Sequence, residues 1–268
     1  MSSKVHPLSL SSFNKNHELY DKVRPDFDNV AVEKLIDNLG LKKGSKVLEL
    51  ACGTGKFTKS IANREYDLLA VEPSIGMLET FKKNFPAITV KEGSSYSLPV
   101  DDNSQDAVIA AQAFHWFADR DSLKEISRVL KPGGKLGLIW NYDDCADLPE
   151  THWQRRVCEY CFSLRDALPQ YDQSKWRTVF EEEDQFYFRV PIGEERIRVI
   201  VTYPLNKDLL WYSWKSRSYI TAMTPERQAE VRSQIIKLFE EGLSPDEVEA
   251  GKIQYRQGVH IVWVEVNK

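Results

Sequence analysis

Short apolar runs alternate with segments of helical apolar spacing along the first half of the chain. The runs predict strands at residues 46–50, 68–71, 88–90, 106–110 and 135–140. The spaced segments predict helices at residues 28–39, 56–63, 74–84 and 122–130, with Asp28 and Gly40 as the caps of the first. Most of the strands are continuously apolar, which is typical of a parallel sheet with helices on both faces.

This rhythm ends after Asn141. Residues 150–182 and 205–241 are predicted to be largely helical, with a helix start at Thr224-Pro225-Glu226. Further strands are predicted at residues 186–190, 197–201 and 259–266. We therefore expect a second half that is built differently from the first.

Composition narrows the class of protein. The chain has 268 residues, of which 42% are hydrophobic, so a packed core is expected. Its net charge is −4 with both signs interspersed, which gives no basic footprint for nucleic acid and no polybasic membrane patch. No signal-like run and no apolar stretch of membrane-spanning length is found, so we expect no membrane insertion and a cytoplasmic location.

Four cysteines are too few and too scattered for a disulfide scaffold. Two of them, Cys158 and Cys161, form a lone CxxC on an apolar helical face that also carries Val157 and Leu164. No second CxxC and no histidine at finger spacing accompanies it. We therefore expect core packing here and no metal site.

The stretch VLELACGTGKFT, residues 47–58, predicts a strand, a glycine turn and a helix. It lacks the GxxxxGK[ST] spacing of a phosphate-binding loop, and Thr58 stands where a dinucleotide fingerprint has its third glycine. Glu72 ends the second strand, where a carboxylate can accept hydrogen bonds from both ribose hydroxyls. That geometry serves NAD and S-adenosylmethionine equally.

Glu49, just before the glycines, favours one of these two cofactors. A carboxylate there would repel a phosphate but attract the amino group or sulfonium of S-adenosylmethionine. We therefore expect a cofactor without phosphates.

Four motifs, in their order and spacing, resemble those of the class I S-adenosylmethionine-dependent methyltransferases. They are ELACGTG, AVEPS, GSSYSLPVDDNSQDAV and EISRVLKPGGKLGLIWN. The resemblance covers about residues 13–142. It implies the α/β class, with a doubly wound, Rossmann-like, mostly parallel sheet of seven strands and a helical insertion or cap in the C-terminal half.

Further segments resemble one branch of this family, which contains trans-aconitate methyltransferases and fungal cantharidin-resistance methyltransferases. They are Phe13, Tyr20 and Arg24-Pro25 near the start, QAFHWF at residues 112–117, WYSW at 211–214 and Ser218-Tyr219. The branch acts on small molecules, often carboxylic acids. The resemblance implies one methyltransferase domain, with residues 1–142 as N-terminal segment and cofactor-binding half and 143–268 as substrate cap and final strands.

The resemblance also implies which residues hold the cofactor, S-adenosylmethionine. They are Tyr20, Arg24, Glu49, Gly53, Gly55, Glu72, Ser94, Ser95 and Gln112. Positions 95 and 96 depart from the family's usual alanine and acidic residue, so backbone contacts to adenine are expected there. Arg24 is expected to pair with the cofactor's carboxylate.

The methyl acceptor is expected to be a small molecule, methylated on an oxygen of a carboxylic acid or hydroxyl by direct SN2 transfer. His115 is predicted either to act as a base or only to line the pocket. Further pocket candidates are Trp116, Trp140, Asn141, Trp211, Trp214, Arg217 and Tyr219. Arg217 is expected to orient a carboxylic acid. A non-catalytic cofactor-binding regulator and a protein methyltransferase remain the alternatives, and the oligomeric state is left open.

Overall fold

The structure is a computed structural model of the chain, and it describes residues 21–165, 169–183 and 185–268. Among these residues, seven strands form a sheet in the order β3-β2-β1-β4-β5-β7-β6. They are β1 Lys46–Leu50, β2 Asp67–Glu72, β3 Thr89–Glu92, β4 Gln105–Ala111, β5 Leu130–Asp143, β6 Gly193–Pro204 and β7 Lys252–Glu265. β1 to β5 pair in parallel, whereas β7 is antiparallel to both of its neighbours. This confirms the predicted fold class.

In the first half of the chain the observed helices follow the predicted positions closely. The helices of both halves are given next. They are α2 Asn29–Leu39, α3 Thr58–Ile61, α4 Ile75–Asn84, α5 Arg120–Val129, α6 Trp153–Ser163, α7 Lys175–Thr178, α8 Lys207–Lys215, α9 Ser218–Thr221, α10 Pro225–Gly242 and α11 Pro245–Ala250, with short 3₁₀ turns η1 Phe114–Trp116 and η2 Tyr171–Gln173. The Asp28 side chain accepts from the Ala31 amide and Gly40 ends α2 in the left-handed conformation, so both predicted caps of this helix are confirmed.

The two faces of the sheet are covered by different helices. Ala107 and Ile109 of β4 face a core that includes residues of α2 and α3. Val108, between them, faces the opposite core with Leu123 and Ile126 of α5. Because both faces are buried, β4 has to be apolar at successive positions, which explains the continuous run in the sequence.

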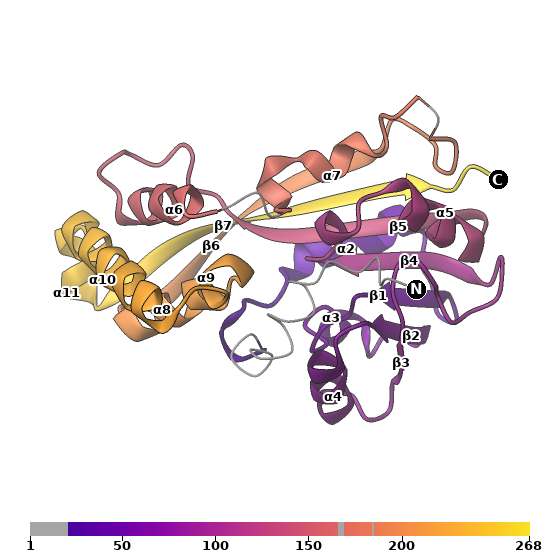
Figure 1. Cartoon of the computed structure of the whole chain (residues 1–268), viewed down its shortest axis with the longest axis horizontal. Helices are drawn as coiled ribbons and strands as arrows, with labels where there is room; N and C mark the ends of the chain where they lie inside the picture. Colours follow the sequence, from indigo (N-terminus) through magenta and orange to yellow (C-terminus); the bar gives the residue numbers. More distant parts are fainter. Residues whose placement is uncertain (1–20, 166–168, 184) are drawn as a thin grey trace.

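A third core lies in the helical cap, where α6, α8, α9 and α10 pack with the start of β7. Figure 1 shows β5, β6 and β7 running from the five-stranded parallel region out to this cap. Cys158 and Cys161 are free and buried in the cap core, which confirms the packing interpretation of the CxxC. Among the described residues, no group of His, Cys, Asp and Glu could hold a metal ion.

Several predicted elements differ from those observed. The helix expected at 56–63 is reduced to Thr58–Ile61, because the glycine turn extends to Phe57. Residues 186–190 form no strand; only an isolated bridge joins Phe188 to Val266. β5, β6 and β7 are each longer than expected.

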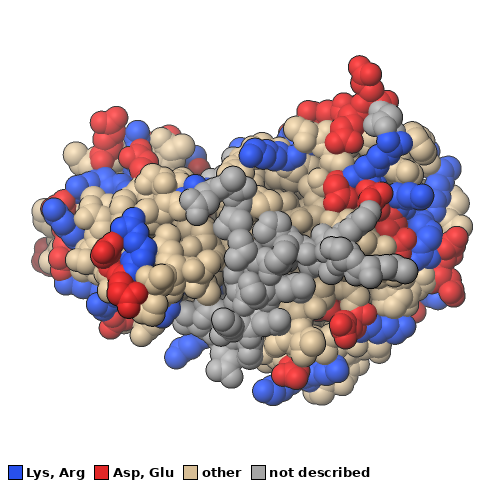
Figure 2. Space-filling view, viewed as in Figure 1, with Lys and Arg blue, Asp and Glu red and all other residues tan. Residues whose placement is uncertain are grey.

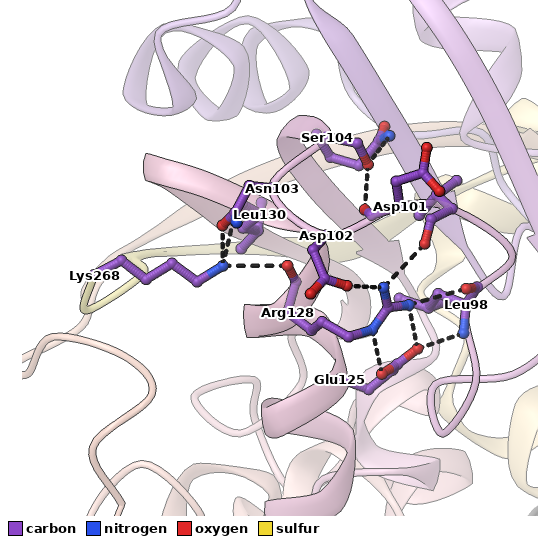
Figure 3. Close-up of polar contacts among 11 residues, drawn as sticks. Leu98, Asp101, Asp102, Asn103, Ser104, Glu125, Arg128, Leu130 and Lys268 are labelled. Atoms are coloured by element: carbon purple, nitrogen blue, oxygen red, sulfur yellow. Dashed lines mark hydrogen bonds and ion pairs between the residues drawn. The ribbon is translucent and has the colours of Figure 1, made fainter.

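Arg128 of α5 ties the loop after β3 to this helix (Figure 3). Its guanidinium donates to the backbone oxygens of Leu98 and Val100 at 3.1 and 3.0 Å and to the Glu125 carboxylate at 2.7 Å. Glu125 in turn accepts from the Leu98 amide at 2.7 Å. This network fixes the segment that directly follows residues 94–96.

The charged side chains of the described residues can be followed on the face of the molecule that Figure 2 shows. In Figure 2, acidic and basic side chains are interspersed over the visible face. None of the helices in the described part of the chain has the length and apolar character needed to cross a bilayer.

Candidate functional site

Three adjoining cavities open at the carboxyl ends of the parallel strands, where open α/β sheets place their ligands. The first, of about 920 Å³ with its open mouth included, lies over β1, β2 and β4. The second, of about 940 Å³ on the same measure, extends toward α8, and the third, of about 790 Å³, extends toward α6 and η2. Of the described lining residues, Gln112 alone belongs to all three. Its side-chain amide donates to the backbone oxygen of Asn141 at 2.8 Å, and this hydrogen bond joins the ends of β4 and β5.

The first cavity has the lining expected for a nucleoside. The glycine turn forms one wall, Glu72 and Pro73 at the end of β2 a second, and Ser94 to Tyr96 a third. Met77 and Phe117 add apolar surface. Lys56 is its one cation among the described lining residues, so these walls do not provide a basic cradle for phosphates.

Glu72 is held rigidly at this cavity. Its two carboxylate oxygens accept from the Gly53 amide at 2.9 Å and the Ser74 amide at 2.8 Å. Each oxygen keeps a further lone pair that a ribose hydroxyl can use. The side chain is only 5% exposed, and this burial raises its pKa to about 7 despite the two backbone hydrogen bonds.

The glycine turn approaches the cavity through its backbone. Ala51 and Gly53 both adopt positive φ, 55° and 58°, and both line the first cavity. Gly55, at φ 93°, is not among the described lining residues. A Cβ on Gly55 would point at the Phe85 ring, 2.6 Å from its Cδ2, and so away from the direct cofactor contact that the resemblance implied for this residue. Gly55 therefore shapes the turn from behind.

Glu49 occupies a different position from the one expected. It is buried beneath the turn, where it accepts from the Thr58 hydroxyl at 2.6 Å, and it is not among the described residues that line the cavities. Burial raises its pKa to about 8, so in the free protein it is mainly protonated at neutral pH. The electrostatic argument that favoured a phosphate-free cofactor therefore does not hold for this residue.

Ser94, Ser95 and Tyr96 line the side of the first cavity where adenine is expected. The Ser95 hydroxyl is bonded to Ser122 of α5 at 2.8 Å, and the Tyr96 hydroxyl donates to Asp119 at 2.6 Å. Both side chains thus already have partners in the protein. Part of the backbone is bonded as well, since the Tyr96 amide donates to the Ser94 hydroxyl and the Ser97 amide donates to the Ser94 backbone oxygen. The backbone contacts to adenine that the sequence suggested stay a prediction for the other backbone groups of this segment.

The third cavity is cationic. Its charged lining residues among those described are Arg24, Arg165 and Arg217, against a single carboxylate, Asp143. Arg24 also lines the second cavity and contacts the Ser216 oxygen at 3.4 Å. It is not among the described residues of the first cavity. An excess of positive charge therefore stands next to the nucleoside cavity in a chain that is net negative.

Arg217 reaches this region, but its fork is already occupied. Its guanidinium nitrogens meet the two oxygens of Asp143 at 2.8 and 2.9 Å, and Tyr255 donates to the same carboxylate. The guanidinium also lies over the Trp214 ring, 3.8 Å from its centroid. The expectation that Arg217 orients a carboxylic acid is thus not supported by this geometry, because Asp143 occupies both terminal nitrogens of the guanidinium.

His115 lines the third cavity and is held by Trp140. The Trp140 indole nitrogen donates to His115 Nδ1 at 3.2 Å, so the neutral ring carries its proton on Nε2. Burial and the nearby charge of Arg165 lower the pKa of His115 to about 3. The histidine is therefore a neutral hydrogen-bond donor at physiological pH and is poorly suited to act as a base.

The aromatic candidates separate into two groups. Trp116 lines the first and third cavities, as the sequence suggested. Trp140, Trp211, Trp214 and Tyr219 are buried and are not among the described lining residues. Trp140 packs in the sheet core and the other three in the cap core, so their contribution is to the walls behind the cavities. Tyr20 lies outside the described residues.

Several cavity residues escaped the sequence analysis. Arg165 and Tyr171 line the third cavity, and Phe27 lies between the first and second. Arg165 and Tyr171 belong to the poorly patterned region after α6. No local motif marks them, since the fold brings them to the strand ends from a distance.

Comparison with known proteins identifies the fold and the domain. Residues 48–138 match the methyltransferase domain family. An uncharacterized methyltransferase-like protein of Schizosaccharomyces pombe is 36% identical over 65% of this chain and 66% of its own length. The chain spans about half to two thirds of the length of the curated relatives that it matches first.

Two solved structures share the fold at low sequence identity. A putative type II methyltransferase from Anaeromyxobacter dehalogenans has a TM-score of 0.65 at 18% identity, covering 90% of this chain and 97% of its own. An N-methyltransferase of Haemonchus contortus, determined with phosphomonomethylethanolamine and S-adenosylhomocysteine, has a TM-score of 0.53 at 14% identity, covering 95% and 58%.

Proposed function

Since the chain belongs to the class I S-adenosylmethionine-dependent methyltransferases, we propose that it methylates the carboxylate of a small organic acid. The observation that carries this proposal is the third cavity, where three arginines face one aspartate beside the cofactor cavity. An anionic acceptor is attracted to such a site although the chain as a whole is acidic.

The cofactor cavity fits S-adenosylmethionine. Glu72 would accept hydrogen bonds from the ribose hydroxyls, the backbone of residues 94–96 would contact adenine, and Gly53 would allow close backbone approach. Gln112, at the junction of the three cavities, would lie near the methionine end. When bound, the cofactor supplies a sulfonium-activated methyl group for in-line displacement.

The protein's own task is then to position the acceptor and exclude water. A carboxylate is already ionised at neutral pH and needs no base. A neutral His115 with its proton on Nε2 fits this reaction, because it donates a hydrogen bond to an acceptor oxygen instead of removing a proton. The same geometry makes a hydroxyl acceptor the less favoured of the two acceptors expected from the sequence.

The titration of Glu72 predicts how cofactor affinity depends on pH. Ribose hydroxyls donate to the ionised carboxylate, so binding favours the deprotonated form of a group whose pKa is about 7. The affinity for S-adenosylhomocysteine is therefore expected to rise with pH through this range. Between pH 8 and pH 6 the Kd should increase about tenfold, measured by calorimetric titration.

Two glutamine variants separate the carboxylates that titrate here. Glu72→Gln should bind more weakly at pH 8 and show a flat profile. Glu49→Gln removes the other buried carboxylate, whose pKa is about 8, and should retain the pH dependence because Glu49 lies behind the turn. A pH dependence that survives in Glu72→Gln and disappears in Glu49→Gln would reverse the assignment.

His115→Ala tests whether a base is required. With a carboxylic acid as acceptor, kcat is expected to fall less than about tenfold, since loss of a general base typically costs on the order of 100-fold or more. The pH–rate profile of the variant should keep the shape of the parent's between pH 6 and 8. A loss of 100-fold or more at saturating acid would show that His115 removes a proton.

The proposed function is tested with S-adenosylmethionine labelled in its methyl group and a panel of aliphatic mono- and dicarboxylic acids, matched alcohols and a mixed peptide. Label is expected on acids as base-labile methyl esters. Arg165→Ala should raise the KM for acids at least about tenfold, because a charge-assisted hydrogen bond is removed from the cavity. Arg156→Ala is the matched control and should leave KM unchanged, because Arg156 pairs with Glu241 of α10 and is not among the described lining residues of the three cavities.

Other outcomes would identify the alternatives. Label on the peptide and not on acids would indicate a protein methyltransferase. Tight binding of S-adenosylhomocysteine without transfer to any class would indicate a non-catalytic binder. Label on alcohols alone would contradict the assignment of a carboxylate acceptor.

We further propose a cytoplasmic location. The four cysteines are free and buried, a state that suits a reducing compartment. Fractionation of cells that express the tagged chain would test this proposal.

A further inference from the structure

A buried histidine, His260, lies behind the third cavity, which is the proposed binding site of the methyl acceptor and is called the acceptor cavity below. It stands on β7 directly opposite Trp140 of β5, and its side chain is 0% exposed. Its Nδ1 lies 2.8 Å from the Tyr171 hydroxyl and its Nε2 lies 2.9 Å from Glu194 of β6. Glu194 also accepts from Arg177 of α7. Four side chains from four elements are thus linked in one chain of hydrogen bonds.

The direction of these hydrogen bonds follows from the charge on Glu194. Its partners Arg177 and His260 lower the pKa of this carboxyl although burial opposes them, so it is ionised and only accepts. His260 therefore donates from Nε2, and its Nδ1 accepts from Tyr171. The tyrosine hydroxyl points at a buried histidine, while Tyr171 still contributes to the wall of the third cavity.

An apolar residue at position 260 would avoid the free-energy cost of burying the two polar ring nitrogens of His260. The ring is surrounded by Trp140 and Trp176, with centroids at 6.0 and 5.9 Å, and an imidazole in such a site is costly unless both nitrogens are satisfied. Both are satisfied here. A fully satisfied buried polar network specifies one arrangement of its members, and the member that needs specifying is Tyr171, which sits on a single 3₁₀ turn.

We propose that the His260–Glu194 pair positions Tyr171 as a fixed wall of the acceptor cavity, so that Tyr171 helps to determine acceptor affinity. The inference rests on the proposed function for the identity of the cavity. His260 and Glu194 are positioning residues that act through Tyr171, whose ring also packs on Trp140 at 5.0 Å. Because the hydroxyl is turned toward His260, the tyrosine offers its ring to the cavity, next to the charged side chains. This arrangement suits the hydrocarbon part of an organic acid.

The test compares Tyr171→Phe, His260→Gln and the double variant. With hexanoate and succinate as acceptors, each single variant is expected to raise the acceptor KM about tenfold, with kcat changed less than threefold and the Kd for S-adenosylhomocysteine unchanged. Because both changes break the same link, the double variant should be no worse than the poorer single. Glu194→Gln keeps an oxygen that accepts from Nε2 and should stay within threefold of the parent.

A spectroscopic arm follows the network without any acceptor. In protein labelled with ¹⁵N-histidine, His260 is expected as the Nε2-protonated tautomer, and its Nδ1 resonance should shift in Tyr171→Phe. An unchanged resonance would show that Tyr171 is not bonded to His260, and additive or absent KM effects would show a structural role only.

If the parent labels no acid in the panel, the proposed function fails, and with it the role in acceptor affinity, while the resonance still decides whether His260 positions Tyr171. Tyr171→Phe removes one oxygen, so the test stands even if His260→Gln does not fold.

Discussion

Arg217→Ala is expected to lower the free energy of unfolding by about 3–5 kcal/mol, measured by urea denaturation at pH 7. The partner side chains are 15% and 9% exposed, so removal of the guanidinium leaves the Asp143 carboxylate buried, with the Tyr255 hydroxyl as its remaining side-chain donor among the described residues. Burial alone would raise the pKa of Asp143, but Arg217 holds it below the usual value. The cost of this variant is therefore a stability cost before it is a catalytic one.

The pH dependence gives this prediction its sign. A carboxylate whose pKa is depressed in the folded state contributes stability above its unfolded pKa, and that contribution is lost as pH falls through the folded value. Without Arg217 the buried Asp143 becomes easier to protonate, so the deficit of the variant should shrink toward pH 4. Arg217→Met combined with Asp143→Asn removes both charges and should recover most of the stability. A single Arg217→Ala variant as stable as the parent would show that the pair is not buried in solution.

This pair also illustrates what local sequence could reveal of the site. The segment WYSWKSRSYI correctly indicated a cation among aromatic residues near the cavities. It could not show that Asp143, 74 positions earlier on β5, would occupy that cation. Nor could it show Arg165, since its approach to the strand ends depends on how α6 packs in the cap. Candidate cofactor residues are easier to predict because Gly53 lies shortly after β1 and Glu72 ends β2, and a parallel sheet places the ends of adjacent strands side by side.

In the fold, too, some elements can be predicted from local sequence and others depend on residues that are distant along the chain. Strands buried on both faces are largely apolar at successive positions, so Ala107 to Ala110 could be recognised directly, and so could Val47 to Leu50 although it contains the buried Glu49. β6 alternates half-buried and exposed positions along its whole length and begins with Gly-Glu-Glu-Arg. An apolar run therefore marks only its middle, and the charged start becomes a strand because β7 supplies twelve consecutive cross-strand partners. Tertiary pairing, rather than local propensity, sets the length of this strand.

Gly55→Val is expected to weaken binding of S-adenosylhomocysteine at least about tenfold, roughly 1.4 kcal/mol, by calorimetric titration. The residue has φ 93°, which a β-branched side chain rarely adopts, and its Cβ would overlap the Phe85 ring and approach Phe81 at 3.2 Å. Either the turn or the end of α4 has to move. Both movements reach the cofactor, because Asn84 of α4 donates to the Thr54 oxygen at 3.0 Å and the Gly53 amide donates to Glu72.

Gly133 provides the control for strain alone. It too has a positive φ, 76°, but a Cβ there meets nothing within 4 Å, and it lies outside the described lining of the three cavities. Gly133→Val should therefore cost stability through its backbone conformation and leave the affinity for S-adenosylhomocysteine intact. Equal losses of affinity in both variants would trace the effect to general destabilisation. An affinity unchanged in Gly55→Val would mean that the turn absorbs the added side chain without disturbing Gly53 and Glu72, and the account of the cofactor cavity given by these residues would then be wrong.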